Sequence, residues 1–448
     1  MIRFRIVWFG FIFILLHTTS AWAIPAFSQQ TGAPCSSCHA ASFGPQLTPF
    51  GQQFKLLGYT PGRSDQDWTH FSAMMLASYN QTQRGQPGGA APDFNSNDNT
   101  ALDQVSLFYG GRLSDHIGTL VQVTYDGVAK HTSWDNLDLR AAGQGSLAGS
   151  NLIYGLSLNN NPTVQDVWNS TPAWSYPYVG SALAPTPTAA TLIEGGLAQQ
   201  VLGLTAYTLI DNHWYLEVGG YRNLPNGTLN ALGVQPDGLP YLKGVAPYYR
   251  AAYQWAWGND FGSVGIYGLL NAQIYPGGVR NVGTDRYDDY GFDATYQIAP
   301  SSDNAWEFIA SLVRELQHLP ASVALGNANN VSDALTSIHL TANYSYQHTW
   351  TGLVSAFDLS GNPDPTLYAP DPIDGSTSGK PDSRGYIFEA AYVPFGKAGS
   401  LWAPWINLRV GLQYTLYTHF NGGGVNYDGS GRNASDNNTL YLFLWTIF

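Results

Sequence analysis

The chain has 448 residues, of which only 11% are charged and 14% are aromatic. A soluble domain usually carries about 25% charged residues, and a disordered chain is short of aromatic residues. The net charge of −12 excludes a strongly basic nucleic-acid binder, and two cysteines are too few for a disulfide framework. An aromatic, glycine-rich chain of low charge is what a transmembrane β-barrel requires.

The N-terminus has the features of a secretory signal peptide. Two arginines precede an apolar run over residues 6–16, and an A-x-A cleavage site ends at Ala23. The alternative, a membrane anchor, needs roughly 20 apolar residues, and this run has only about 11. We therefore expect residues 1–23 to be removed and the mature chain to begin at Ile24.

Both cysteines fall in one motif, Cys35-Ser36-Ser37-Cys38-His39. C-x-x-C-H is the attachment signature of c-type haem, in which two thiols form thioether bonds and the histidine binds the iron as proximal ligand. A disulfide between the cysteines would leave the histidine without a role, and a zinc site would need two further ligands. The sequence predicts one covalently attached haem c held by Cys35, Cys38 and His39.

The stretch from Ile24 to Tyr59 resembles the N-terminal segment of the fused monohaem cytochrome-porins of iron-oxidising bacteria. The shared elements are Pro25, Phe27, Gln30-Thr31-Gly32, the haem motif, Pro45, Leu47-Thr48, Gly51, Phe54-Lys55 and Gly58-Tyr59. Gly44-Pro45-Gln46-Leu47 also resembles the G-P-x-L of small cytochromes c, which implies that the Pro45 carbonyl accepts a hydrogen bond from the haem histidine.

The remainder of the chain alternates apolar and polar residues in short runs. Period two over about ten residues, clearest at 406–416 and 337–347, is typical of a strand with one lipid face and one polar face. The expected strands begin near residues 69, 101, 118, 134, 151, 197, 213, 247, 261, 286, 305, 334, 351, 385, 403 and 438. We predict an all-β fold, a 16-stranded antiparallel outer-membrane β-barrel whose lumen is plugged by a small N-terminal c-type haem segment.

Three regions follow from these patterns: a signal peptide (1–23), a monohaem c-type cytochrome segment (24–66) and a porin-like barrel (67–448). The connections alternate in length, and the long ones are expected on the outer side, near 81–100, 160–198, 223–246, 360–384 and 421–437. The last strand ends in Phe448, which resembles the signal read by the outer-membrane barrel assembly machinery. Its Tyr441, Phe443 and Trp445 either line a plug or show that the two faces are inverted.

The sixth position of the haem iron has three candidate ligands that the alternation places in the lumen: His70, Met74 and His339. A methionine ligand would raise the haem potential. Lumen acids such as Asp138 and Glu389 are candidate guides for a cation, or are hydrogen-bond partners of the barrel wall.

The resemblance implies electron transfer across the outer membrane, from extracellular Fe(II) to a periplasmic cytochrome or copper-protein carrier. The other expected partner is the lipid of the outer membrane, which surrounds the barrel. No nucleic-acid partner is expected. Three alternatives stay open: electron transfer in the opposite direction or with another extracellular donor or acceptor, a porin or channel whose haem segment is structural and only holds the plug in place, and a substrate-specific porin whose haem segment hangs free in the periplasm.

Overall fold

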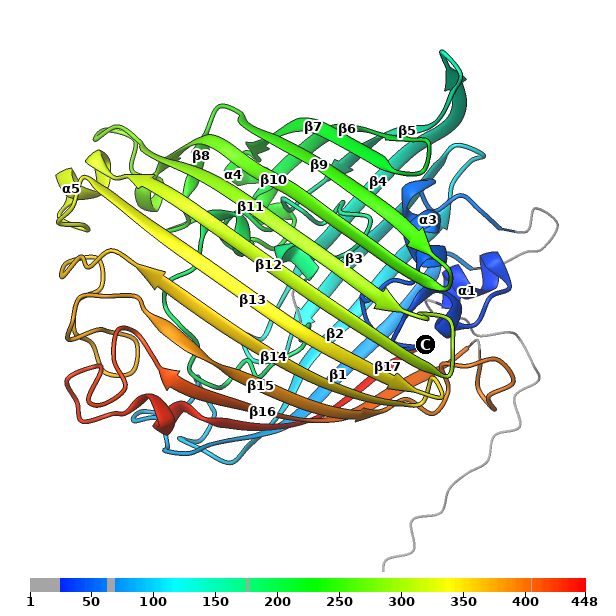
Figure 1. The fold of residues 1–448 in the computed structure, drawn as a ribbon. Helices are drawn as coiled ribbons and strands as arrows, with labels where there is room; N and C mark the ends of the chain where they lie inside the picture. Colours follow the sequence, from blue (N-terminus) through cyan, green and yellow to red (C-terminus); the bar gives the residue numbers. More distant parts are fainter. Residues whose placement is uncertain (1–24, 63–68, 175–176, 404) are drawn as a thin grey trace, which may run out of the picture.

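The computed structural model describes residues 25–62, 69–174, 177–403 and 405–448. Within them, sixteen long antiparallel strands form one closed barrel (Figure 1). Each strand pairs with the next in sequence, and β17 pairs with β1 to close the sheet. The short strand β8 pairs with the end of β10, beside β9. The predicted signal peptide lies outside the described residues.

The strands are β1 Phe71–Thr82, β2 Asn99–Arg112, β3 Ile117–Asp126, β4 His131–Leu147, β5 Ser150–Asn159, β6 Val201–Ile210, β7 Trp214–Asn223, β8 Tyr241–Lys243, β9 Ala246–Trp257, β10 Asp260–Tyr275, β11 Asp285–Ile298, β12 Asn304–His318, β13 Ser332–Tyr346, β14 Trp350–Gly361, β15 Ser383–Tyr392, β16 Asn407–His419 and β17 Thr439–Ile447. The predicted count of sixteen is confirmed, and every predicted start lies within four residues of the observed one.

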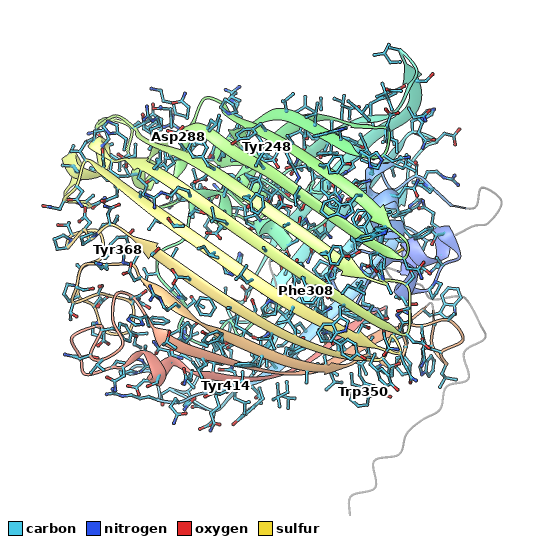
Figure 2. The ribbon with its side chains drawn as sticks, in the orientation of Figure 1. Tyr248, Asp288, Phe308, Trp350, Tyr368 and Tyr414 are labelled. Carbon is cyan, nitrogen blue, oxygen red and sulfur yellow. The ribbon has the colours of Figure 1, made fainter. Side chains whose placement is uncertain are left out.

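The outer surface of the barrel is apolar because alternate residues of each strand face away from the lumen. Leu204, Val218 and Leu340, for example, are 57%, 64% and 54% exposed. At the end with the short turns, large aromatic residues such as Phe308 and Trp350 form part of this surface (Figure 2). An apolar band with interfacial aromatic residues is what a lipid bilayer requires.

The lumen face is polar and carries buried ion pairs. Arg140 pairs with Asp138 at 2.8 Å, and Arg250 pairs with Asp293 at 2.8 Å. All four side chains are almost fully buried. Since water is excluded around these pairs, the lumen at this level is filled with protein.

Two segments fill the lumen. The first is the N-terminal segment (25–62), with helices α1 Pro25–Thr31, α2 Cys35–Cys38 and α3 Pro49–Leu56, which lies at the end of the barrel that carries the short turns (Figure 1). Helices α4 Asn226–Ala231 and α5 Pro320–Leu325 lie in long connections at the opposite end. Among the described residues, none of the helices is long and apolar enough to cross a membrane.

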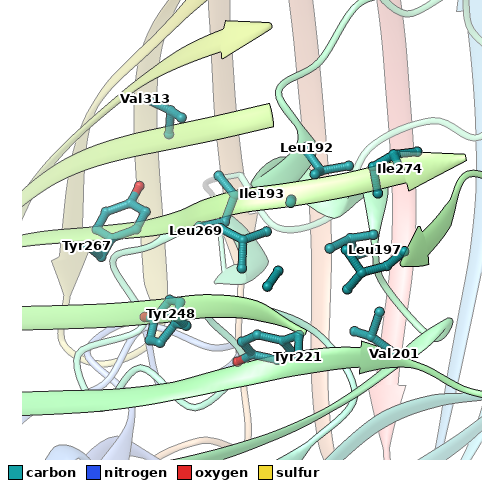
Figure 3. Close-up of a cluster of buried hydrophobic side chains, with 13 residues drawn as sticks. Leu192, Ile193, Leu197, Val201, Tyr221, Tyr248, Tyr267, Leu269, Ile274 and Val313 are labelled. Carbon is teal, nitrogen blue, oxygen red and sulfur yellow. The ribbon is translucent and has the colours of Figure 1, made fainter. Parts of the chain in front are cut away.

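The second is the connection between β5 and β6 (160–198), here called the inner segment. The prediction of an outer loop is wrong for this connection, because it folds into the lumen. Asp166 pairs with Arg250 of β9 at 3.2 Å, and the Leu192 amide donates to Glu315 of β12 at 2.6 Å. Leu192, Ile193 and Leu197 pack against apolar wall residues such as Leu269 (Figure 3).

Candidate functional site

The haem motif forms one short helical turn, α2. Pro34 precedes the turn in an extended conformation, and the His39 amide closes it by donating to the Cys35 carbonyl at 2.8 Å. Residues three apart in a helix lie on the same face, so one turn brings Cys35 and Cys38 to one side. Both are free cysteines and both line the same cavity. This local turn therefore gives the two thiols the arrangement that the C-x-x-C-H spacing predicts.

A tight connection returns the chain from His39 to α3. His39 and Leu47 form an antiparallel bridge, and the Thr48 amide donates to the Cys38 carbonyl at 2.9 Å. Thr48 also caps α3 by accepting from the Gly51 amide at 3.3 Å. A Cβ at Gly51 would lie 2.3 Å from the Cys38 carbonyl oxygen, so only glycine allows α3 to approach the motif this closely.

The cavity beside the motif is enclosed jointly by the N-terminal segment, the inner segment and the barrel wall. The cavity has a volume of about 200 Å³, taken as the space that the centre of a water molecule can occupy. The total space free of protein atoms, including the opening to solvent, is about 1230 Å³. Its lining is mainly apolar and aromatic, and includes Phe27, Phe43, Leu47, Phe54, Tyr59, Met74, Phe108, Leu120, Trp174, Tyr178, Trp445 and Ile447. Ligand sites of this character pair an apolar wall with a few polar groups.

His39 presents a neutral ring to this cavity. Burial lowers the pKa of His39 to about 4, and neutral imidazole is the form that binds metal. Nδ1 is buried and has no hydrogen-bond partner among the described residues. The carbonyls of Gly44 and Gln46 lie close enough to raise the pKa, but neither has hydrogen-bond geometry to Nδ1.

The two thiols share this environment. Burial raises the pKa of Cys35 and raises the pKa of Cys38 to about 12. Neither cysteine is a thiolate at neutral pH, which is unlike a nucleophilic cysteine. The apolar cavity, the neutral histidine and the unreactive thiols fit a covalently held haem better than they fit thiol catalysis.

The Pro45 carbonyl does not accept the hydrogen bond that the resemblance predicts. It accepts instead from Asn169 Nδ2 of the inner segment at 2.7 Å. Asn169 Oδ1 in turn accepts from Lys55 Nζ of α3 at 2.7 Å. This bridge joins the N-terminal segment to the inner segment beside the haem motif.

Lys55 is a residue of the site to which the sequence assigned no role. It is 4% exposed, lines the cavity and also donates from Nζ to the Val164 carbonyl at 2.8 Å. Burial lowers the pKa of Lys55 to about 7, and the nearby Arg140 adds to the effect. Lys55 is the one lysine of the N-terminal segment, and it belongs to the Phe54-Lys55 pair that carries the resemblance. That pair was the feature of the sequence that could have pointed to a role for Lys55.

The aromatic face of the last strand lines the plug. Tyr441, Phe443 and Trp445 are buried, whereas Leu442 and Leu444 are 45% and 39% exposed. The Trp445 ring packs edge-on against Phe43 of the N-terminal segment, with centroids 4.7 Å apart. The faces are therefore as predicted, and the aromatic residues pack against protein rather than water.

The three candidate iron ligands lie in different places. Met74 lines the cavity with Cys35, Cys38 and His39. His70 stacks on Tyr109, with centroids 5.1 Å apart, and is not among the residues that line this cavity. His339 lines a separate cavity, where its Nε2 lies 3.8 Å from Glu194 Oε1.

The two lumen acids that were candidate cation guides are already paired. Asp138 binds Arg140 and accepts from Tyr59 Oη at 2.6 Å, and Glu389 binds Arg409. Of the two interpretations, a hydrogen-bond partner of the wall is the one the structure supports. Among the described residues, no group of three or more His, Cys, Asp or Glu side chains is arranged to hold a metal ion.

Neither a protein-family model nor a curated protein sequence matches the chain. Several solved structures are similar in fold. An anion-selective porin of Comamonas acidovorans has a TM-score of 0.44 and 12% identity over 84% of this chain and 98% of its own. OprB of Pseudomonas putida has a TM-score of 0.45 and 13% identity over 84% and 94%. The channel DcaP of Acinetobacter baumannii has a TM-score of 0.44 and 9% identity over 84% and 96%.

The membrane location follows from the barrel itself. The sheet is closed, its outward face is an apolar band, and its lumen face is polar. Only a closed barrel satisfies every strand hydrogen bond within a bilayer, and such barrels belong to outer membranes. The chain is a bacterial outer-membrane β-barrel.

Proposed function

We propose that the protein is an outer-membrane c-type cytochrome that transfers electrons between an extracellular donor and a periplasmic carrier. One haem c would be attached through Cys35 and Cys38 and bound by His39. The carrying observation is that these three residues together line one mainly apolar cavity. A C-x-x-C-H motif on a solvent-exposed surface would offer no such environment.

The position of the cavity supports an exit for electrons towards the periplasm. The N-terminal segment lies at the end with the short turns, and short turns face the periplasm in outer-membrane barrels. When bound, haem c supplies a one-electron redox centre. The resemblance to the cytochrome-porins of iron-oxidising bacteria favours Fe²⁺ as donor, which loses one electron and becomes Fe³⁺, and a soluble cytochrome or copper protein as acceptor.

Covalent attachment is tested first. The outer-membrane fraction should contain a protein of this size that retains haem stain after denaturing electrophoresis, and a Cys35→Ser, Cys38→Ser double variant should lose the stain. The control is a Ser37→Ala variant, which keeps both thiols and should stain like the unmodified protein. Unstained wild-type protein, present in the membrane at a normal level, would disprove haem attachment.

The donor is tested on the haem-containing protein in proteoliposomes. Free Fe²⁺ added outside should reduce the haem, as followed by its absorption spectrum, and a large chelated Fe(II) complex should act more slowly if the donor enters the lumen. Equal reduction by both would argue against lumen entry. No reduction by either, while dithionite still reduces the haem, would exclude iron oxidation.

A second candidate function, a porin-type channel, is favoured by one observation. A cavity of about 250 Å³ in the lumen has a lining in which polar side chains, including Ser170, Glu194 and His339, alternate with apolar ones, so the inner segment does not fill the barrel completely. Single-channel conductance in a planar bilayer separates the two functions. An electron-transfer barrel should be closed or nearly closed to ions, and a solute channel should conduct steadily.

A further inference from the structure

We propose that the Sδ atom of Met74 is the sixth ligand of the haem iron. The inference rests on the proposed function, because it concerns a haem bound by His39. It names the residue of the barrel wall that would complete the coordination of the iron. The identity of that ligand influences the redox potential of the haem. Its basis is the position of Met74 in the barrel and the state of the other donor atoms around the cavity.

Met74 lies at the seam where the barrel closes. In β1 it stands opposite Ile447 of β17 on one side and Ser106 of β2 on the other. Alternation along β1 turns its side chain into the lumen, where it is 5% exposed and packs in one cluster with Phe43 and Trp445. It lines the cavity together with Ile447 and with the haem motif.

Two other strong donor atoms of the cavity already make hydrogen bonds. Lys55 Nζ makes two hydrogen bonds, to the Val164 carbonyl and to Asn169 Oδ1. Tyr59 Oη donates to Asp138. The Met74 thioether needs no hydrogen bond, so its lone pairs are available. Tyr178 is the rival, because it lines the cavity and no hydrogen bond to its hydroxyl is found within the described chain.

The chemistry of a thioether suits this cavity. It is neutral, so ligation brings no charge into an apolar space, and it binds iron without losing a proton. Ligation by one methionine and one histidine raises the potential of a c-type haem. Burial in an apolar surrounding is a second factor that tunes this potential. A high potential is what a haem needs in order to accept an electron from Fe²⁺.

The mature chain offers a matched control. Met74 and Met75 are its only methionines and are adjacent in β1, so they point to opposite faces of the sheet. The experiment replaces each by leucine in the full-length protein and compares the ferric absorption spectrum and the midpoint potential. Leucine for methionine conserves volume and usually costs less than about 1.5 kcal/mol, so the barrel is expected to fold. Heat-dependent migration in electrophoresis checks this.

The expected result is that Met74→Leu loses the weak far-red charge-transfer band of methionine-ligated ferric haem and lowers the midpoint potential. Met75→Leu should keep both, and Met74→His should restore a low-spin spectrum at a potential below that of the wild type. An unchanged spectrum in Met74→Leu would overturn the proposal, as would a change confined to Tyr178→Phe. Failure of the proposed function looks different, because the wild-type protein would then carry no covalent haem.

Discussion

Lys55 and Asn169 are joined by a 2.7 Å hydrogen bond from Nζ to Oδ1, and this bond links the N-terminal segment to the inner segment. Asn169 also donates to the Pro45 carbonyl at 2.7 Å. One side chain of the inner segment therefore holds the N-terminal segment at two points, Pro45 and Lys55, on the C-terminal side of the haem motif. The stability of this corner of the plug should depend on it.

Asn169→Ala should loosen the N-terminal segment without unfolding the barrel. The change leaves the half-buried Pro45 carbonyl without its donor and removes one acceptor of the buried Lys55. An unpaired polar group that is fully buried costs about 1–3 kcal/mol, which is the upper range for this change. Hydrogen exchange of the α3 amides should accelerate by the corresponding factor. Asn226→Ala, at an exposed asparagine of α4, is the control and should leave α3 unchanged. Equal exchange of α3 in both variants would contradict the role of the bridge.

The docking of the N-terminal segment should strengthen as the pH rises above about 7. Burial lowers the pKa of Lys55 from 10.5 to about 7, so the folded site binds fewer protons than the open one between these values. The cost of burying the charged amine is present in full below pH 7. It is relieved by at most about 1.4 kcal/mol per pH unit up to pH 10.5.

Hydrogen exchange of α3 measures this effect, after correction for the intrinsic pH dependence of exchange. Protection should increase between pH 7 and pH 10 in the wild type and should be flat in Lys55→Met, which retains the length of the side chain without the amine. A rising profile in Lys55→Met would assign the effect to another group.

Gly51→Ala should displace α3 from the haem motif. The added Cβ meets the Cys38 carbonyl oxygen at 2.3 Å, and overpacking of this kind typically costs about 1–3 kcal/mol. We expect faster proteolysis of the N-terminal segment and, if haem is attached, a lower yield of haem-stained protein. The control is Gly227→Ala in α4, where a Cβ has open space. Similar proteolysis of both variants would show that the close approach is unimportant.

The barrel could be predicted because the same alternation of apolar and polar residues recurs in every strand. A lipid-facing apolar residue alternates with a lumen-facing polar one, so even the sixteen starts could be placed. The residues of the resemblance also find structural roles. Gln30 donates to the Tyr59 carbonyl at 2.7 Å, and the ring of Phe27 stacks on that of Tyr59 with centroids 5.4 Å apart. The core of the N-terminal segment is thus built from residues that carry the resemblance.

The inner segment was not predictable from its position between two strands, because length and turn residues alone describe an outer loop. Its composition held a signal. It carries buried Val164, Val167 and Trp168, and few charged residues. The sequence also could not show that Asp138 pairs with Arg140. The two residues lie two positions apart on one face of a strand, and the same pattern is compatible with two unpaired charges in the lumen. Whether a lumen acid forms an ion pair in the folded barrel therefore decides its role.

The anchor of the inner segment gives the last prediction. Arg250 of β9 holds two buried carboxylates, Asp293 at 2.8 Å and Asp166 at 3.2 Å, and all three side chains are fully buried. Removing one partner of a buried ion pair typically costs about 3–5 kcal/mol, because the remaining charge is left unpaired. Arg250→Met should therefore release the part of the inner segment around Asp166 from the wall.

Planar-bilayer recordings detect the release as ion conductance. Arg250→Met should conduct more than the wild type, because water and ions enter the space that the segment vacates. The matched control is Arg384→Met, which breaks the exposed pair with Asp358, 2.8 Å apart on the barrel, where a surface ion pair is worth at most about 1 kcal/mol. Conductance equal to the wild type in Arg250→Met, in a barrel that still shows heat-dependent migration, would mean that the inner segment is held by its remaining contacts, such as the bond from the Leu192 amide to Glu315 of β12.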